Sequence, residues 1–198
     1  IYESNGYFRK AAAYQGGKLK KDSATGDYLK VALLYEIAGA NADQKRVLKQ
    51  LRGVASKRTF ASATEARLIY QTFDEAGLFN TRILELPWSE SQRCIIHERL
   101  AVEQGLTKTR RKALLSCPEE TGNQWAAAMW TRVQPLADKQ AKIKFYGKGS
   151  ERKFNRRMKA IKALAAEIDS FLPRVKKENY LKLTGLGERS YRQFAEEI

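Results

Sequence analysis

Residues 139–171 read KQAKIKFYGKGSERKFNRRMKAIKALAAEIDSF, and this stretch decides both the fold class and the charge of the chain. Beyond the Gly-Lys-Gly-Ser segment at 147–150, apolar residues recur at alternating steps of four and three: Phe154, Met158, Ile161, Ala165, Ile168 and Phe171. This spacing predicts a long helix with one buried face. Helical spacing recurs along the rest of the chain, which holds only 13 Gly and 4 Pro. The sequence therefore predicts an all-α protein, a compact multi-helix domain of roughly seven to nine helices.

The same stretch carries most of the positive charge. Between Lys139 and Lys162 lie ten Lys and Arg residues and one acid, Glu151, which gives +9 of the +15 of the whole chain. Several of these cations fall in the first turns of the predicted helix, where the helix dipole favours acids. A local group of charges that violates this preference is typical of a functional surface. The commonest partner of such a surface is a nucleic acid. The structural alternative is a solvated helix face whose charges pair with acids elsewhere in the fold.

We predict phosphate contacts from three basic clusters. The first covers residues 139–162 around the central helix, the second residues 45–58, and the third residues 108–112 in a short helix predicted for 107–117. Their candidate binding residues are, in this order, Lys142, Lys144, Lys148, Arg152, Lys153, Arg156, Arg157 and Lys159; Lys45, Arg46, Lys49 and Arg52; and Lys108, Arg110 and Arg111.

The remaining helices are predicted from caps and apolar spacing. Residues 28–38, 62–77, 89–105 and 123–145 have this pattern, with Gly39, Gly77 and Gly105 as stops. Residues 78–87 are the best candidate for an extended segment, either a short edge strand or a loop. The Pro118–Gly122 turn is the predicted boundary between an N-terminal half, residues 1–118, and a basic C-terminal half, residues 119–198, although one continuous domain is the alternative.

Residues 180–190, YLKLTGLGERS, resemble a helix-hairpin-helix element. In that family two short helices flank a Gly-hydrophobic-Gly turn whose backbone amides bind a nucleic-acid phosphate. Phe194 stands where the second helix needs an apolar residue, whereas Tyr191 stands where the motif prefers a small one. The resemblance covers about a tenth of the chain and implies a short C-terminal helical hairpin that binds a phosphate. A purely structural Gly-Leu-Gly turn between two helices is the alternative.

The sequence predicts no catalytic, metal or cofactor site. There is one histidine, His97, and the two cysteines, Cys94 and Cys117, lack metal-ligand spacing. The cysteines allow one disulfide, but a reducing compartment is the default expectation. Among the aromatic residues, Trp88 and Tyr146 are the candidates for stacking on an unpaired base.

These patterns predict a non-catalytic protein that binds the phosphate backbone of DNA or RNA as part of a larger nucleoprotein assembly, with other protein subunits as further partners. In size, charge and helicity the chain resembles the small helical subunits of RNA-guided effector complexes. Two alternatives stay open: a piece or subunit of a nucleic-acid-processing enzyme, and an assembly protein that binds an acidic protein. Since no apolar run reaches the roughly 18–20 residues that span a bilayer, we expect no membrane partner and a cytoplasmic or nucleoid-associated protein.

Overall fold

The computed structural model describes residues 6–57, 60, 62–146 and 149–198, and the chain divides into two compact units, Ile1–Arg93 and Cys94–Ile198. The described residues form helices and no strand, which confirms the all-α prediction. The predicted boundary at 118/119 lies inside the second unit, between its second and third helices. No helix in the described ranges combines the length and the apolar character needed to cross a lipid bilayer.

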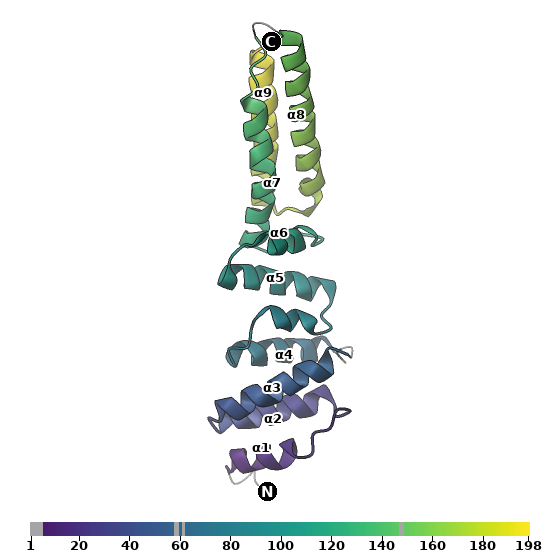
Figure 1. Cartoon of the computed structure of the whole chain (residues 1–198), viewed down its shortest axis with the longest axis vertical. Coiled ribbons are helices and arrows are strands. Elements are labelled where there is room, and N and C mark those ends of the chain that lie inside the picture. The colour runs from purple at the N-terminus through teal and green to yellow at the C-terminus, as the bar shows by residue number, and fades with distance from the viewer. Residues whose placement is uncertain (1–5, 58–59, 61, 147–148) are drawn as a thin grey trace. The chain divides into compact units, whose positions relative to one another are not determined.

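The first unit consists of short helices packed on one another (Figure 1). Their inward faces carry large apolar side chains, among them Leu48, Leu51, Ile69 and Phe73, which are fully buried. Burial of such side chains is the main stabilising contribution. The helices are α1 (Phe8–Gly16), α2 (Thr25–Ile37), α3 (Asn41–Ala55) and α4 (Ala63–Glu75).

The segment predicted to be extended is helical instead. Thr81–Glu85 forms a 3-10 helix, η1, which the Asn80 side chain caps by accepting the Arg82 amide at 3.0 Å. Ile83 and Leu86 are buried although they are three residues apart. A strand would place them on opposite faces, whereas a 3-10 turn brings positions three apart to one side.

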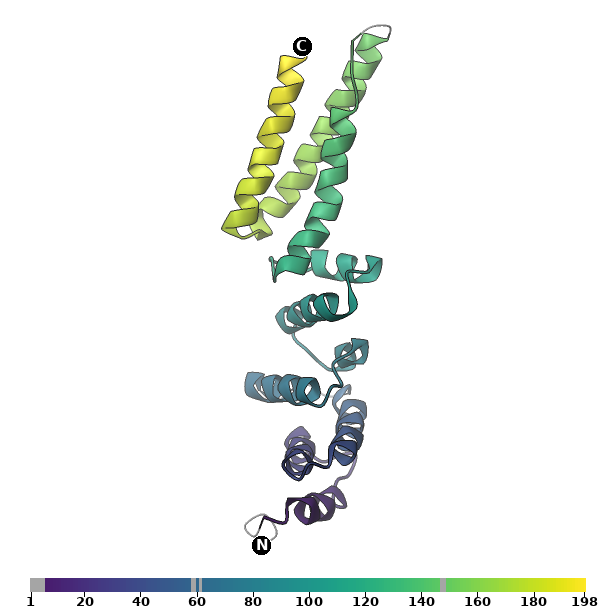
Figure 2. The same cartoon turned by 90° about the vertical axis from the view of Figure 1, so that its left-hand side faces the viewer.

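The second unit is built around three long helices that lie side by side in both views (Figures 1 and 2). Its core contains Trp125, Met129, Leu164 and Leu183, and the Trp125 ring packs edge-on against another aromatic residue of the core, with ring centroids 5.8 Å apart. The elements are α5 (Glu90–Gln104), which belongs to this unit from Cys94 on, α6 (Lys108–Leu115), α7 (Asn123–Ala141), α8 (Ser150–Phe171), η2 (Leu172–Arg174) and α9 (Lys177–Glu196).

The predicted helix-hairpin-helix element is absent from the described structure. Residues 180–190 lie inside the single helix α9, and Gly185 and Gly187 have no positive φ. A glycine permits a turn but does not require one. Here the helix is favoured because Leu183 and Phe194, on one face of it, are both buried in the second unit. A phosphate-binding hairpin turn at this position is therefore ruled out as an interpretation of the motif.

Two carboxylates, one buried and one half-buried, connect helices of the second unit through hydrogen bonds. The Glu98 side chain of α5 accepts the backbone amides of Gln124 at 2.6 Å and Trp125 at 2.9 Å, and thereby caps the start of α7. Glu120 accepts the Lys176 amide at 2.9 Å and the Asn179 side chain at 2.8 Å, which fixes the start of α9. Because both carboxylates accept hydrogen bonds within the unit, they are not available to neutralise surface cations.

Cys94 and Cys117 form a disulfide that joins α5 to the end of α6, with Cα atoms 5.8 Å apart. The sequence allows this bond, although the default expectation of a reducing compartment favours free thiols. Both residues are buried in the core of the second unit. Disulfides of this kind persist mainly in oxidising compartments.

We expect reduction of this disulfide to lower the free energy of unfolding of the second unit by about 3 kcal/mol, the value for a closed loop of this length. The measurement is urea unfolding with and without a phosphine reductant, together with a free-thiol assay on the denatured chain. Because the chain has only two cysteines, the reductant acts on this bond alone. Two free thiols in the unreduced protein, with no effect of the reductant, would contradict the assignment.

Candidate nucleic-acid interface

The end of α7 and the start of α8 enclose a basic hollow of about 590 Å³, which we call the α7–α8 hollow. Gly149 precedes α8 with φ of 74°, a left-handed conformation that favours glycine and turns the chain into the helix. Five cations and one acid contribute to the lining: Lys139, Lys142, Lys144, Lys153, Arg156 and Asp138. The hollow therefore concentrates positive charge from two helices and the segment between them.

Most of these cations carry no compensating charge. Within the part of the chain that the structure describes, Lys139, Lys142, Lys153 and Arg156 form no ion pair. Lys144 is the exception, with its ammonium 3.2 Å from a Glu197 carboxylate oxygen. Like charges held together without counter-ions attract a polyanion and release its condensed counterions on binding.

Arg157, predicted as a phosphate contact, is instead buried with no exposed side-chain surface. Its guanidinium donates to the Glu197 carboxylate and to the Ile143 carbonyl, the latter at 3.3 Å. It also lies 5.4 Å from the ring centroid of Phe145 and 5.6 Å from that of Phe194. Arg157 is therefore a structural residue that cannot reach a phosphate.

The predicted apolar stripe of α8 agrees with the structure at Ile161, Ile168 and Phe171, which are buried, and Phe154 packs against two other aromatic rings; the pattern missed Arg157 on the same face. The buried residues of α8 are Arg157, Ile161, Leu164, Ile168 and Phe171, which recur at steps of four and three. This stripe begins on a charged residue, whereas the predicted stripe began on Phe154 and Met158. Helical spacing places position 157 on the same face as position 161, but only the packing of α7 and α9 shows that this charged side chain is buried.

The other predicted cations of this cluster differ in position. Arg152 and Lys159 are exposed on α8 but do not line the hollow. Lys148 lies outside the described residues. Lys139, which the candidate list had omitted, does line the hollow. Lys139 lies four residues after Pro135 and three before Lys142, which places it on the same face of α7 as Lys142. This spacing could have identified it from the sequence.

The third predicted cluster forms a second basic hollow of about 470 Å³, the α6–α7 hollow. Lys108, Arg111 and Lys112 of α6 line it together with Arg132 of α7, which pairs with Glu167 at 2.8 Å. Arg110 does not contribute, because its guanidinium donates to the carbonyls of residues 104 and 105 at 2.9 and 2.8 Å and closes the turn between α5 and α6. The sequence placed Arg110 here and omitted Lys112 and Arg132 from the candidate residues.

The second predicted cluster, on α3, is partly neutralised. Arg46 pairs with Asp43 at 2.8 Å, and Arg52, whose side chain is only 14% exposed, lies 3.8 Å from Glu85. Lys45 and Lys49 are exposed. None of these four residues lines a described hollow.

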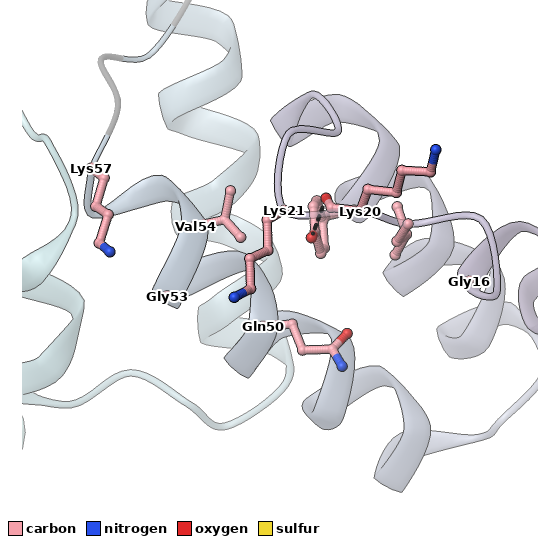
Figure 3. Close-up of a pocket in the computed structure, with 9 residues that line it drawn as sticks. Gly16, Lys20, Lys21, Gln50, Gly53, Val54 and Lys57 are labelled. Carbon is pink, nitrogen blue, oxygen red and sulfur yellow. Dashed lines mark hydrogen bonds between the residues drawn. The ribbon is translucent and has the colours of Figure 1, made fainter.

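The first unit has a hollow of its own, of about 610 Å³, at α3 and the segment between α1 and α2. Lys20, Lys21 and Lys57 contribute to its lining, and the Tyr28 hydroxyl donates to the Lys20 carbonyl at 2.9 Å. Figure 3 shows the three lysine side chains pointing in different directions, so they do not form a common anion site in this conformation.

The two aromatic candidates for base stacking have opposite environments. Trp88 is buried, its indole nitrogen donates to the Ile83 carbonyl at 2.6 Å, and its ring lies 4.9 Å from that of Phe60. It is a core residue of the first unit. Tyr146 is 69% exposed and follows Lys144, which lines the α7–α8 hollow, by two residues.

No protein-family model, curated protein or solved structure matches this chain significantly. Function must therefore be argued from the chain's own residues. Their chemistry is that of cation donors from α6, α7 and α8, with an exposed tyrosine two residues beyond Lys144. Such groups bind anions, and phosphates above all, without base-edge recognition.

The Glu197 carboxylate should contribute stability in a pH-dependent way. The hydrogen bond from Arg157 holds the pKa of Glu197 below its ordinary value, and Lys144 adds to the effect. A carboxyl whose pKa is depressed in the folded state stabilises the fold above its unfolded pKa, and this contribution is lost as the pH falls through the folded pKa.

We therefore expect Glu197→Gln to lower the free energy of unfolding at pH 7 by more than the roughly 0.5 kcal/mol of an exposed pair, because Arg157 would keep a buried charge without a counter-ion. The difference from the wild type should shrink below about pH 4.5. Urea unfolding at a series of pH values measures it. The control is Glu188→Gln, which removes the exposed pair with Arg192 on the same helix. Equal losses for both variants at pH 7 would contradict this role.

Proposed function

We propose that this chain binds nucleic acid, DNA or RNA, through the phosphate backbone, and that the α7–α8 hollow is the main contact. The observation that carries the proposal is the convergence of four cations without ion-pair partners, Lys139, Lys142, Lys153 and Arg156, in one hollow. Lys and Arg that neutralise phosphates release condensed counterions, and this release supplies most of a sequence-independent affinity.

A solvated basic surface without a partner is the plain alternative. It is disfavoured by where the acids of the second unit lie. Glu98, Glu120 and Glu197 are engaged in holding the unit together, and Asp138, the one acid among the described lining residues, stands against five cations. An acidic protein could also neutralise these cations. If that were the partner, this chain would show no preference for nucleic acid over other polyanions.

The proposed role is a binding subunit of a larger nucleoprotein assembly, in the cytoplasm or on the nucleoid. The disulfide is relevant to this localisation, because a reducing cytoplasm would keep Cys94 and Cys117 as free thiols. The thiol state of the protein recovered from cells therefore tests the localisation separately from binding.

Removal of three hollow cations in the triple variant Lys142→Gln, Lys153→Gln and Arg156→Gln should weaken binding at least tenfold at about 100 mM salt. It should also make the slope of log affinity against log salt less steep by about 2, since each lost phosphate contact removes about 0.7 to 0.9 from the slope. Fluorescence anisotropy with labelled DNA and RNA across a salt series measures both effects.

The matched control is Lys162→Gln, Lys177→Gln and Arg189→Gln, which removes the same residue types from exposed positions outside both hollows. This control should keep most of the wild-type affinity and slope. Equal losses in the two triple variants would show that total charge, and not the hollow, determines binding. No binding of any nucleic acid even at about 50 mM salt would contradict the proposed function.

A further inference from the structure

We infer that the two basic hollows of the second unit form one continuous track for a single-stranded nucleic acid, which runs along α7 from the α7–α8 hollow to the α6–α7 hollow. This inference rests on the proposed function and adds to it the strand type and the path. Three observations carry it: the register of α7, the distance between the hollows, and the exposed aromatic ring at one end.

One face of α7 lines both hollows. Arg132 belongs to the α6–α7 hollow, whereas Pro135, Lys139 and Lys142 belong to the α7–α8 hollow. These positions follow one another at steps of three, four and three residues, which places them on the same side of a helix. The two hollows therefore open along one edge of α7 and not on opposite sides of the unit.

The distance along this edge suits a short run of nucleotides. Arg132 and Lys142 are ten residues apart, and a helix rises by 1.5 Å per residue, so their separation along the axis is about 15 Å. A stacked strand advances by about 3.4 Å per nucleotide. Phosphates held in the two hollows would thus be about four nucleotides apart, and one strand can occupy both.

Tyr146 favours a single strand over a duplex. Its ring is 69% exposed, and it follows Lys144, a lining residue of the α7–α8 hollow, by two residues. An exposed aromatic ring beside a basic groove is the usual platform for an unpaired base, and stacking contributes about 1–3 kcal/mol per base. In a duplex the bases are stacked on each other and are not available to such a ring.

The path between the hollows contains little opposing charge. Asp138 lines the α7–α8 hollow but accepts the Gln134 side chain at 2.8 Å, and Glu167 is paired with Arg132. On α8, the face that begins at Lys153 and Arg156 continues through Ala160 and Ala163, which are small and uncharged. A phosphate backbone that passes from one hollow to the other therefore meets one carboxylate without an ion pair among these residues, that of Asp138, which lies in the same lining as Lys139 and Lys142.

The test uses the full chain with a fluorescent thymidine oligomer of about ten nucleotides, one of about three, and a duplex of about ten base pairs, each at about 50 mM salt. Affinity and stoichiometry are measured for the wild type and for Arg111→Gln with Lys112→Gln, which removes two cations of the α6–α7 hollow. The matched control, Lys177→Gln with Arg189→Gln, removes the same residue types outside both hollows. Circular dichroism confirms that each variant is folded.

If the track is continuous, one long oligomer binds per chain, and loss of the α6–α7 cations weakens it about tenfold. The short oligomer, which can be held by the other hollow alone, should change less than threefold. Two long oligomers per chain, or no effect of the Arg111 and Lys112 changes beyond the control, would overturn the track while leaving binding at the α7–α8 hollow intact. Absence of binding by every oligomer would overturn the track and the proposed function together.

The ring at position 146 is tested separately. Tyr146→Ala should weaken the long single strand about tenfold and leave duplex binding unchanged, whereas Tyr146→Phe should behave like the wild type. Tyr146→Trp in a Trp130→Phe background provides a direct readout, because Trp88 and Trp125 are buried whereas Trp130 is only partly buried, so that the new indole would be the one quenched strongly by a stacked thymine. A preference for duplex, with no loss in Tyr146→Ala, would overturn the single-strand assignment.

Discussion

The buried ion pair between Arg157 and Glu197 is the interaction on which the second unit and its basic hollow depend. A guanidinium with no exposed surface is stable only if its charge is compensated. Glu197 from the end of α9 and the Ile143 carbonyl both accept from Nη1, whereas Nε and Nη2 have no hydrogen-bond partner, and the guanidinium lies over the rings of Phe145 and Phe194. The pair thus joins α8, the end of α9 and the segment after α7. That segment carries Lys144 and Tyr146, so the same pair fixes one wall of the α7–α8 hollow.

The distribution of the acids explains why the positive charge is local. In the second unit the carboxylates cap α7, fix the start of α9, and pair with Arg157 and Arg132. Glu98, Glu120, Glu167 and Glu197 are thus engaged within the unit. Other acids stay exposed, but among the described residues only Asp138 lines either hollow, beside the lysines and arginines of α6, α7 and α8. The fold and the proposed function are linked, because the acids that cap or pair within the helices are not available to neutralise the cations of the two hollows.

Most helices were predictable because apolar spacing, N-caps and glycine stops agree with one another. Ser62 and Ser89 both cap helices as their spacing predicted. The exceptions have physical causes. Gly185 and Gly187 permit a hairpin turn, but burial of Leu183 and Phe194 keeps α9 continuous. Arg157 stands on the buried stripe of α8, a position that sequence assigns to an apolar residue and that only the facing ion pair makes tolerable.

For the candidate site, the sequence identified the charge but not its grouping. It predicted Lys142, Lys144, Lys153 and Arg156, which do line one hollow, since the short connection between α7 and α8 places them together. It could not predict that Arg132 joins the α6 cluster, because that contact depends on how α6 packs against α7. Nor could it show that the turn between α5 and α6 engages Arg110, or that Trp88 is a core residue.

The most direct test of the account is a nuclear magnetic resonance titration of the isotope-labelled chain with a short thymidine oligomer. The account predicts that backbone amide shifts change along α7, at the start of α8 and on α6, and that those of residues 16–57 around the hollow of the first unit stay constant. Shifts confined to the first unit, or spread evenly over all exposed lysines and arginines, would contradict the claim that the acids of the second unit leave a localised phosphate-binding surface.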